Sequence, residues 1–166
     1  IKDMGSEYIG FLYVGLMIKN EKPYLIEFNV RMGDPECQTI LPLLENDLSE
    51  IFFDCCVGKL SEKKIKLSAK KSICIVLCSK GYPDDYKKDS EISKLNKLSL
   101  KNNEYIYHAG TKLKNNKVLN SGGRVLNFVS TSNNLKESRD DLIKLIKILD
   151  WKDGFFRKDI AYKVID

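Results

Sequence analysis

The chain of 166 residues has no apolar run of the roughly 18 residues that a membrane-spanning helix requires, so we expect no membrane partner. Its first residues are polar, unlike a signal peptide, and the first of them is not Met. We therefore expect a piece of a longer chain. There is no internal repeat and no low-complexity tract, and a hydrophobic content of 43% indicates a packed globular protein.

Cysteine usage argues against a zinc centre and against a disulfide framework. The five cysteines include no pair with CxxC spacing, and their number is odd. Cys55 and Cys56 fall in an apolar helical pattern, and Cys74 and Cys78 bracket an apolar strand. We predict that these four and Cys37 are buried free thiols, and we expect a cytoplasmic protein.

The net charge of +5 is distributed unevenly. Residues 1–60 carry five basic and ten acidic residues, whereas residues 61–166 carry 23 basic and 13 acidic residues. The break predicts two units, 1–60 and 61–166. A basic second half raises nucleic-acid binding as an alternative function. Its lysines are scattered among acids, Asn and Ser, however, which favours a solvated surface, so we expect no nucleic acid as partner.

In the first part of the chain, hydrophobic patterning predicts a β-hairpin and two helices. Residues 9–18 and 24–31 are the expected strands. A short helix should follow Asp34. A second helix should begin at Asp47 and end near Gly58. Its core stripe would comprise Leu48, Ile51, Phe52 and Cys55.

The second part is predicted to be mainly β with one covering helix. The expected strands and hairpin arms are residues 72–79, 104–109, 111–113, 118–119 and 124–129. Alternation assigns Ile73, Ile75 and Leu77 to the core. A helix should follow from about Asn134. Together the two parts predict an α+β fold.

The stretch from residue 27 to residue 36 carries the strongest functional signal. A strand sends alternate side chains to opposite faces. One face would carry Glu27, Asn29 and Arg31. The other would pack on a core through Phe28, Val30 and Met32. Hard oxygen donors suit Mg²⁺, and a guanidinium suits phosphate or carboxylate.

A turn and a helix start should follow this strand. Gly33 permits a sharp turn, Asp34 suits an N-cap, Pro35 suits the first helical position, and Glu36 suits the first turn. Oxygen ligands and a guanidinium beside a helix start would suit an anion with its metal. Phosphoryl transfer requires this combination.

The chain resembles a known family at landmarks along nearly its whole length. Residues 31–38 (RMGDPECQ) are similar to the signature of the phosphoribosylamine–glycine ligases, purine-biosynthesis enzymes of the ATP-grasp superfamily. Further similar segments are GFLYVGLM at 10–17, GYP at 81–83, YHAGTK at 107–112, GGRVL at 122–126 and WKDGFFRKDI at 151–160. The resemblance implies that residues 1–60 are the C-terminal part of an ATP-grasp domain of antiparallel strands and helices. Residues 61–166 would be the family's mainly β C-terminal domain with its covering helix.

The resemblance also implies a ligase reaction. ATP would phosphorylate glycine, and the amine of 5-phosphoribosylamine would attack the acyl phosphate to give glycinamide ribonucleotide, ADP and phosphate. The resemblance further implies that the lysines and the glycine-rich loop that hold the nucleotide lie in a missing N-terminal portion. The chain itself has neither a P-loop nor GxGxxG. We therefore expect the isolated chain to be inactive. A different ATP-grasp carboxylate–amine ligase is the enzymatic alternative.

By the same resemblance, Glu27 and Asn29 would bind Mg²⁺ or Mn²⁺. Arg31 would be catalytic, steadying the transferring phosphate or the glycine carboxylate. Substrate would also contact the turn formed by Gly33, Asp34, Pro35 and Glu36. Many ATP-grasp enzymes have a further acidic ligand about a dozen residues before the glutamate, where this chain has Val, Gly and Leu. His108, Lys112 and Arg124 flank glycine-containing turns and are candidates for the ribose-phosphate end of the substrate, although structural roles are the alternative for each.

Overall fold

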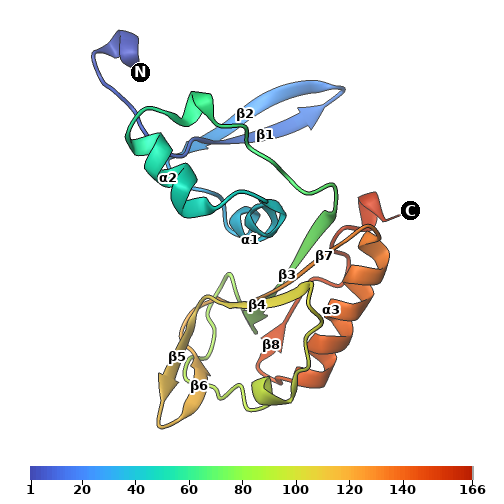
Figure 1. Cartoon of the computed structure of the whole chain (residues 1–166). Helices are drawn as coiled ribbons and strands as arrows, with labels where there is room; N and C mark the ends of the chain where they lie inside the picture. The colour runs from blue at the N-terminus through green and yellow to red at the C-terminus, as the bar shows by residue number, and fades with distance from the viewer. Residues whose placement is uncertain (166) are drawn as a thin grey trace. The chain divides into compact units, whose positions relative to one another are not determined.

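The computed structural model describes residues 1–165 and combines helices with antiparallel sheets, which confirms the predicted α+β class. The chain forms two compact units. The first comprises Ile1–Cys37 and Leu44–Ser68, and the second comprises Gln38–Leu43 and the chain from Ala69 onward. Each unit has its own secondary structure (Figure 1).

The first unit contains the predicted β-hairpin. Strands β1 (Tyr13–Lys19) and β2 (Lys22–Asn29) pair antiparallel around Asn20 and Glu21, which have φ of 51° and 62°. Positive φ at both central residues is typical of a type I′ turn, whose twist matches that of the strands. β1 begins later than predicted. β2 ends at Asn29, so the prediction that Arg31 shares a strand face with Glu27 and Asn29 is wrong.

Two helices follow the hairpin, interrupted by a 3₁₀ turn. Helix α1 (Glu36–Ile40) runs into η2 (Leu41–Leu43), and α2 (Leu48–Cys56) comes next. The carboxylate of Asp47 accepts hydrogen bonds from the backbone N–H groups of Ser49 and Glu50, which confirms the predicted N-cap. Pro35 was expected at the first helical position, but it lies in the turn before α1, after a cis peptide bond with Asp34.

The predicted core of the first unit is largely exposed. Phe28 and Val30 are 59% and 72% exposed, so the expectation that they pack on a core is wrong for this chain. The α2 stripe is also incorrect as a core, because no residue of α2 is buried and Phe52, which contacts Phe11 edge to face, is 43% exposed. Of the five thiols predicted to be buried, Cys74 and Cys78 are buried, Cys37 and Cys55 are half-buried, and Cys56 is exposed.

The second unit is built on a four-stranded antiparallel sheet in the order β4-β7-β3-β8. Its strands are β3 (Lys71–Ser79), β4 (Glu104–His108), β7 (Arg124–Ser132) and β8 (Gly154–Phe155). The first three confirm the predicted strands. β8 was not predicted, because two residues carry no alternation pattern and the strand exists only through its pairing with Cys78 and Ser79.

A hairpin and one long helix complete this unit. Strands β5 (Thr111–Lys114) and β6 (Lys117–Asn120) form the predicted hairpin. Helix α3 (Leu135–Leu149) packs against β3 and β7 (Figure 1). The core between them includes Ile75, Leu77, Phe128 and Leu142, each at most 2% exposed, as the alternation of β3 predicted. The remaining short turns are η1 (Lys2–Met4), η3 (Leu60–Glu62), η4 (Leu95–Lys97) and η5 (Tyr162–Val164).

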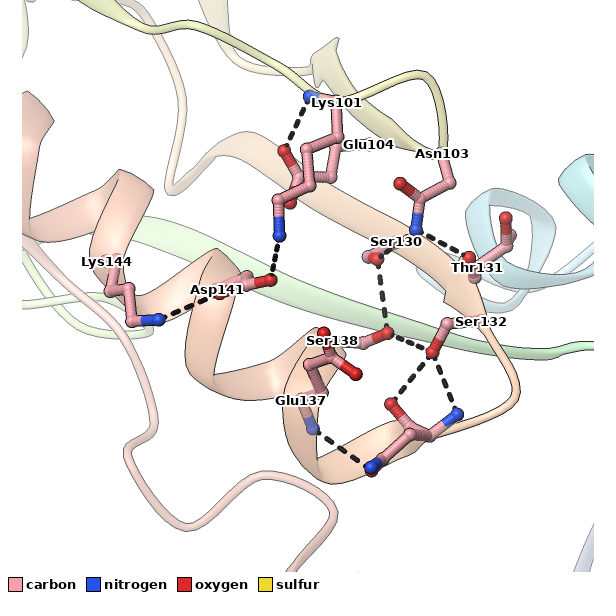
Figure 2. Close-up of polar contacts among 11 residues, drawn as sticks. Lys101, Asn103, Glu104, Ser130, Thr131, Ser132, Glu137, Ser138, Asp141 and Lys144 are labelled. Carbon is pink, nitrogen blue, oxygen red and sulfur yellow. Dashed lines mark hydrogen bonds and ion pairs between the residues drawn. The ribbon is translucent and has the colours of Figure 1, made fainter.

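Polar contacts fix the start of α3 on the sheet. Figure 2 shows Ser138 of α3 between Ser130 of β7 and Ser132, with hydroxyl separations of 3.2 Å and 2.6 Å. The side chain of Asn134 caps the helix by accepting from the N–H groups of Lys136 and Glu137. Ser130 and Ser138 are buried, and a buried hydroxyl without a hydrogen bond lowers stability. The hydrogen bond between them avoids this loss.

The lysines of the second unit are widely paired with acids. Lys101 and Lys144 both contact Asp141 (Figure 2), while Lys94 and Lys152 both contact Asp150. Paired, dispersed charges are typical of a solvated surface and not of a basic nucleic-acid-binding face. Among the described residues, no helix is long and apolar enough to cross a membrane.

Candidate active site

The register of the β1–β2 hairpin determines which side chains gather at the candidate site. Tyr13 lies opposite Asn29, and Gly15 lies opposite Glu27. Opposed residues of antiparallel strands project to the same face of the sheet. Tyr13, Glu27 and Asn29 therefore share one face, with Gly15 leaving a gap beside Glu27.

The pair Glu27 and Asn29 fits a divalent cation. The Glu27 carboxylate is exposed, and a Cβ placed on Gly15 would lie 3.0 Å from its Cγ, so the glycine keeps room for this side chain. Nδ2 of Asn29 is shielded from solvent, and the described residues provide it with no hydrogen-bond partner. A flip of the amide about the Cβ–Cγ bond would place Oδ1 there as an available ligand oxygen.

Glu36 brings a second carboxylate to the same face. Its Oε1 lies 3.4 Å from the phenol oxygen of Tyr13. A Cβ placed on Gly33 would lie 2.8 Å from Cδ of Glu36, so the carboxyl group occupies the space that a side chain at position 33 would fill. The buried Gly33 is therefore required for this placement of Glu36.

The charged groups around Tyr13 shift its pKa. The Glu36 carboxylate, above all, raises the pKa of Tyr13, with a smaller contribution from Glu27, while Arg31 acts in the opposite direction. Arg31 is exposed, and its Nη1 donates to the carbonyl oxygen of Met32 at 2.9 Å. The Gly33 carbonyl accepts from the Cys37 N–H at 2.9 Å, which continues the turn into α1.

The remaining predicted site residues belong to the second unit, around a close approach of two glycines. Gly110 donates its N–H to the carbonyl of Arg124, and its own carbonyl accepts from the N–H of Gly122. His108 Nδ1 lies 2.9 Å from the Thr111 hydroxyl. This contact fits the alternative that His108 has a structural role. Lys112 forms an ion pair with Asp89.

Sequence reasoning overlooked Tyr13. It read this tyrosine only as part of a strand, although the residue lies opposite Asn29. Pairing the two predicted strands across their turn could not have indicated it, because regular pairing places Phe28 opposite Tyr13 and only the register shift between Gly15 and Leu16 moves Asn29 there. Among residues 1–165, no three His, Cys, Asp or Glu side chains gather closely enough to hold a metal ion, so Glu27, Asp34 and Glu36 do not converge on one point.

Comparison with known families places this geometry in context. The profile described as "Phosphoribosylglycinamide synthetase, C domain" matches residues 72–163, more than half of the chain. The chain belongs to the phosphoribosylglycinamide synthetase family. The profile of the same family's ATP-grasp (A) domain matches residues 1–37, which contain Tyr13, Glu27, Asn29 and Glu36. The resemblance noted in the sequence is thereby confirmed.

Relatives of the phosphoribosylglycinamide synthetase family match the chain over nearly all of its length. The phosphoribosylamine–glycine ligase of Caldanaerobacter subterraneus is 42% identical over 161 residues, which are 97% of this chain and 38% of that protein. The trifunctional purine biosynthetic protein adenosine-3 of Gallus gallus is 40% identical over 97% of this chain and 16% of its own length.

A solved structure of the family has the same fold. The crystal structure of phosphoribosylamine–glycine ligase from Thermotoga maritima superimposes with a TM-score of 0.80 at 31% identity, covering 96% of this chain and 39% of that one. The chain thus spans well under half the length of these family members.

Proposed function

We propose that the complete protein to which this chain belongs ligates glycine to 5-phosphoribosylamine, with ATP converted to ADP and phosphate. The observation that carries the proposal is the 42% identity to a phosphoribosylamine–glycine ligase over 97% of the chain. The reaction would proceed through a glycyl phosphate and supply glycinamide ribonucleotide for purine biosynthesis. A cytoplasmic location would suit its five cysteines, none of which forms a disulfide.

Glu27 and Asn29 are proposed as the ligands of Mg²⁺ or Mn²⁺. The gap at Gly15 and the unsatisfied amide of Asn29 support this assignment. When bound, the cation would offset charge on the phosphates of ATP. The role of the two residues is to hold hard oxygen ligands on one face of a hydrogen-bonded hairpin, where the backbone limits their movement.

Arg31 is proposed as the catalytic residue that steadies the transferring phosphate or the glycine carboxylate. Its position beyond the end of β2 leaves its guanidinium exposed at the edge of the site. A guanidinium fork suits either anion because it can donate two parallel hydrogen bonds. Gly33, Asp34, Pro35 and Glu36 are proposed to contact substrate beside it.

In the second unit, His108, Lys112 and Arg124 are proposed to reach the ribose-phosphate end of the substrate. The tight backbone contact between Gly110 and Gly122 supports this proposal, because glycine turns allow a phosphate to approach the backbone closely. Arg124→Ala in the complete protein should raise the KM for phosphoribosylamine. An unchanged KM would remove Arg124 from the site.

A missing N-terminal portion of the same protein is proposed to cover the first unit. Exposed apolar side chains on β1 and β2 support this, as does an open apolar cavity of about 330 Å³ on the side of α2 that carries Phe52. In this proposal residues 1–60 complete an ATP-grasp domain, and residues 61–166 form the C-terminal domain. The missing portion would supply the other side of the nucleotide site.

The test is an assay of the complete protein and of this chain. The complete protein should release ADP only when ATP, glycine and phosphoribosylamine are all present, and the 166-residue chain should release none. ADP release with glycine and a different amine acceptor, but not with phosphoribosylamine, would favour another carboxylate–amine ligase. Product formation by the chain alone would contradict the need for a missing portion.

A further inference from the structure

Two features of the first unit place the half-buried Glu36 and distinguish it from the exposed acids nearby. Gly33 leaves the space that its carboxyl group fills, and the Tyr13 phenol lies 3.4 Å from Oε1. The phenol belongs to β1 and the glycine to the turn before α1. A side chain fixed in this way is suited to recognition, because little rotamer freedom remains to be lost when a ligand binds.

The charge of Glu36 decides what it can recognise. A carboxylate attracts a cation and repels the phosphate or carboxylate groups that Arg31 would attract. Because Glu36 does not converge with Glu27 and Asp34 among the described residues, it does not complete a three-acid metal site. An ammonium group, which donates up to three hydrogen bonds, suits an oriented carboxylate.

We propose that Tyr13 is a positioning residue that holds the Glu36 carboxylate so that it receives the ammonium group of the amino-acid substrate. This inference rests on the proposed function, in which glycine is that substrate. The Tyr13 hydroxyl donates to Oε1 of Glu36, and the ammonium group donates to the carboxylate from the substrate side. Arg31 at the edge of the same site would face the opposite, anionic end of the amino acid.

The 3.4 Å separation between Tyr13 and Glu36 is long for a phenol–carboxylate hydrogen bond, which is usually nearer 2.7 Å. Because the phenol is neutral, its hydrogen bond orients the Glu36 carboxylate without cancelling the negative charge that would attract a cation. The role of Tyr13 is thus expected to appear in glycine affinity and not in the nucleotide half of the reaction.

The test uses Tyr13→Phe, Glu36→Gln and the double variant in the complete protein. Tyr24→Phe is the matched control, because it removes an exposed phenol near the turn of the same hairpin. Glu36→Gln should raise the KM for glycine about tenfold or more, and Tyr13→Phe about three- to tenfold, with the KM for ATP unchanged. The double variant should resemble Glu36→Gln, since the phenol acts through the carboxylate.

Direct binding provides a second readout that does not depend on turnover. In calorimetry, glycine should be bound more weakly by Tyr13→Phe than by Tyr24→Phe. Glu36→Gln should show a smaller preference for glycine over glycolate, which lacks the ammonium group.

Three results would overturn the inference: an unchanged glycine affinity in a folded Tyr13→Phe protein, additive effects of the two substitutions, or an altered requirement for Mg²⁺ with unchanged glycine affinity. Absence of glycine-dependent ADP release in the unmodified protein would instead overturn the proposed function.

Discussion

Gly15 lies directly opposite Glu27 across the β1–β2 hairpin, and a Cβ placed on Gly15 would come within 3.0 Å of Glu27 Cγ. Gly15 and Glu27 belong to the two different strands of the hairpin, and the pairing of the strands brings them together. It makes the orientation of a proposed metal ligand depend on the absence of a side chain on the neighbouring strand.

Substituting Gly15 by Val should therefore weaken metal binding while leaving the hairpin formed. Valine favours strands, but its branched side chain would displace Glu27 from the face shared with Asn29. We expect the Mg²⁺ concentration for half-maximal activity of the complete protein to rise about tenfold or more, because a metal ligand that loses its orientation binds the ion more weakly. Lys19→Ala at the turn end of β1 is the control, and equal Mg²⁺ requirements in both variants would contradict the prediction.

Hydrogen exchange should distinguish the two units of the isolated chain. The amides of β1 and β2 belong to a two-stranded sheet with exposed apolar faces, whereas β3 is a central strand under α3. An isolated hairpin is marginally stable in water. We expect amides in residues 13–29 to exchange at least about a hundredfold faster than those of β3, measured by mass spectrometry. Equal protection would show that the first unit folds independently of any further segment.

The core of the second unit should respond to cavity formation. Leu142 is fully buried between α3 and the sheet, and Leu142→Ala is expected to lower the free energy of unfolding by about 3 kcal/mol. Leu113 is 72% exposed, so Leu113→Ala should change the free energy of unfolding by less than about 0.5 kcal/mol. Urea unfolding followed by circular dichroism measures both, and similar losses in the two variants would contradict the assigned core.

Acid stability should depend on Asp141. Hydrogen bonds from Lys101 and then Lys144 lower the pKa of this carboxyl below its ordinary value of 3.8. A pKa lower in the folded than in the unfolded chain stabilises the fold above the unfolded pKa, and the benefit disappears as the pH falls through the folded pKa.

Asp141→Asn should accordingly destabilise the protein by about 0.5–1 kcal/mol at pH 7, a modest effect because both lysines are largely exposed. The difference from the unmodified chain should shrink as the pH falls from 5 towards 3, about the range in which an aspartate titrates. Urea midpoints measured across this range test the prediction. The exposed neighbour Asp140→Asn is the control, and a difference that grows in acid would refute the assignment.

Most secondary structure could be predicted because it is encoded locally. Alternation in β3 identified Ile73, Ile75 and Leu77, and the Asn134 cap marked the start of α3. The short strand β8 could not be predicted, because its two residues are ordered only by pairing with β3. The exposure of Phe28 was also missed, since an apolar side chain indicates a surface to be covered and does not reveal whether this chain covers it.

The site was predicted in composition but not in arrangement. The sequence alone determined which groups are available: Glu27, Asn29 and Arg31, followed by the turn at Gly33. The arrangement depends on a register shift between Gly15 and Leu16, which leaves Ile26 as an extra residue in β2. Without that shift the pairing that begins at the turn would place Phe28, and not Asn29, opposite Tyr13.

A bulge of this kind is a balance among strand pairing, twist and packing over the whole hairpin, and no local pattern encodes it. For that reason the sequence determined the chemistry that this protein can offer. Only the tertiary structure decided that Tyr13, Asn29 and Glu36 would lie together on one face.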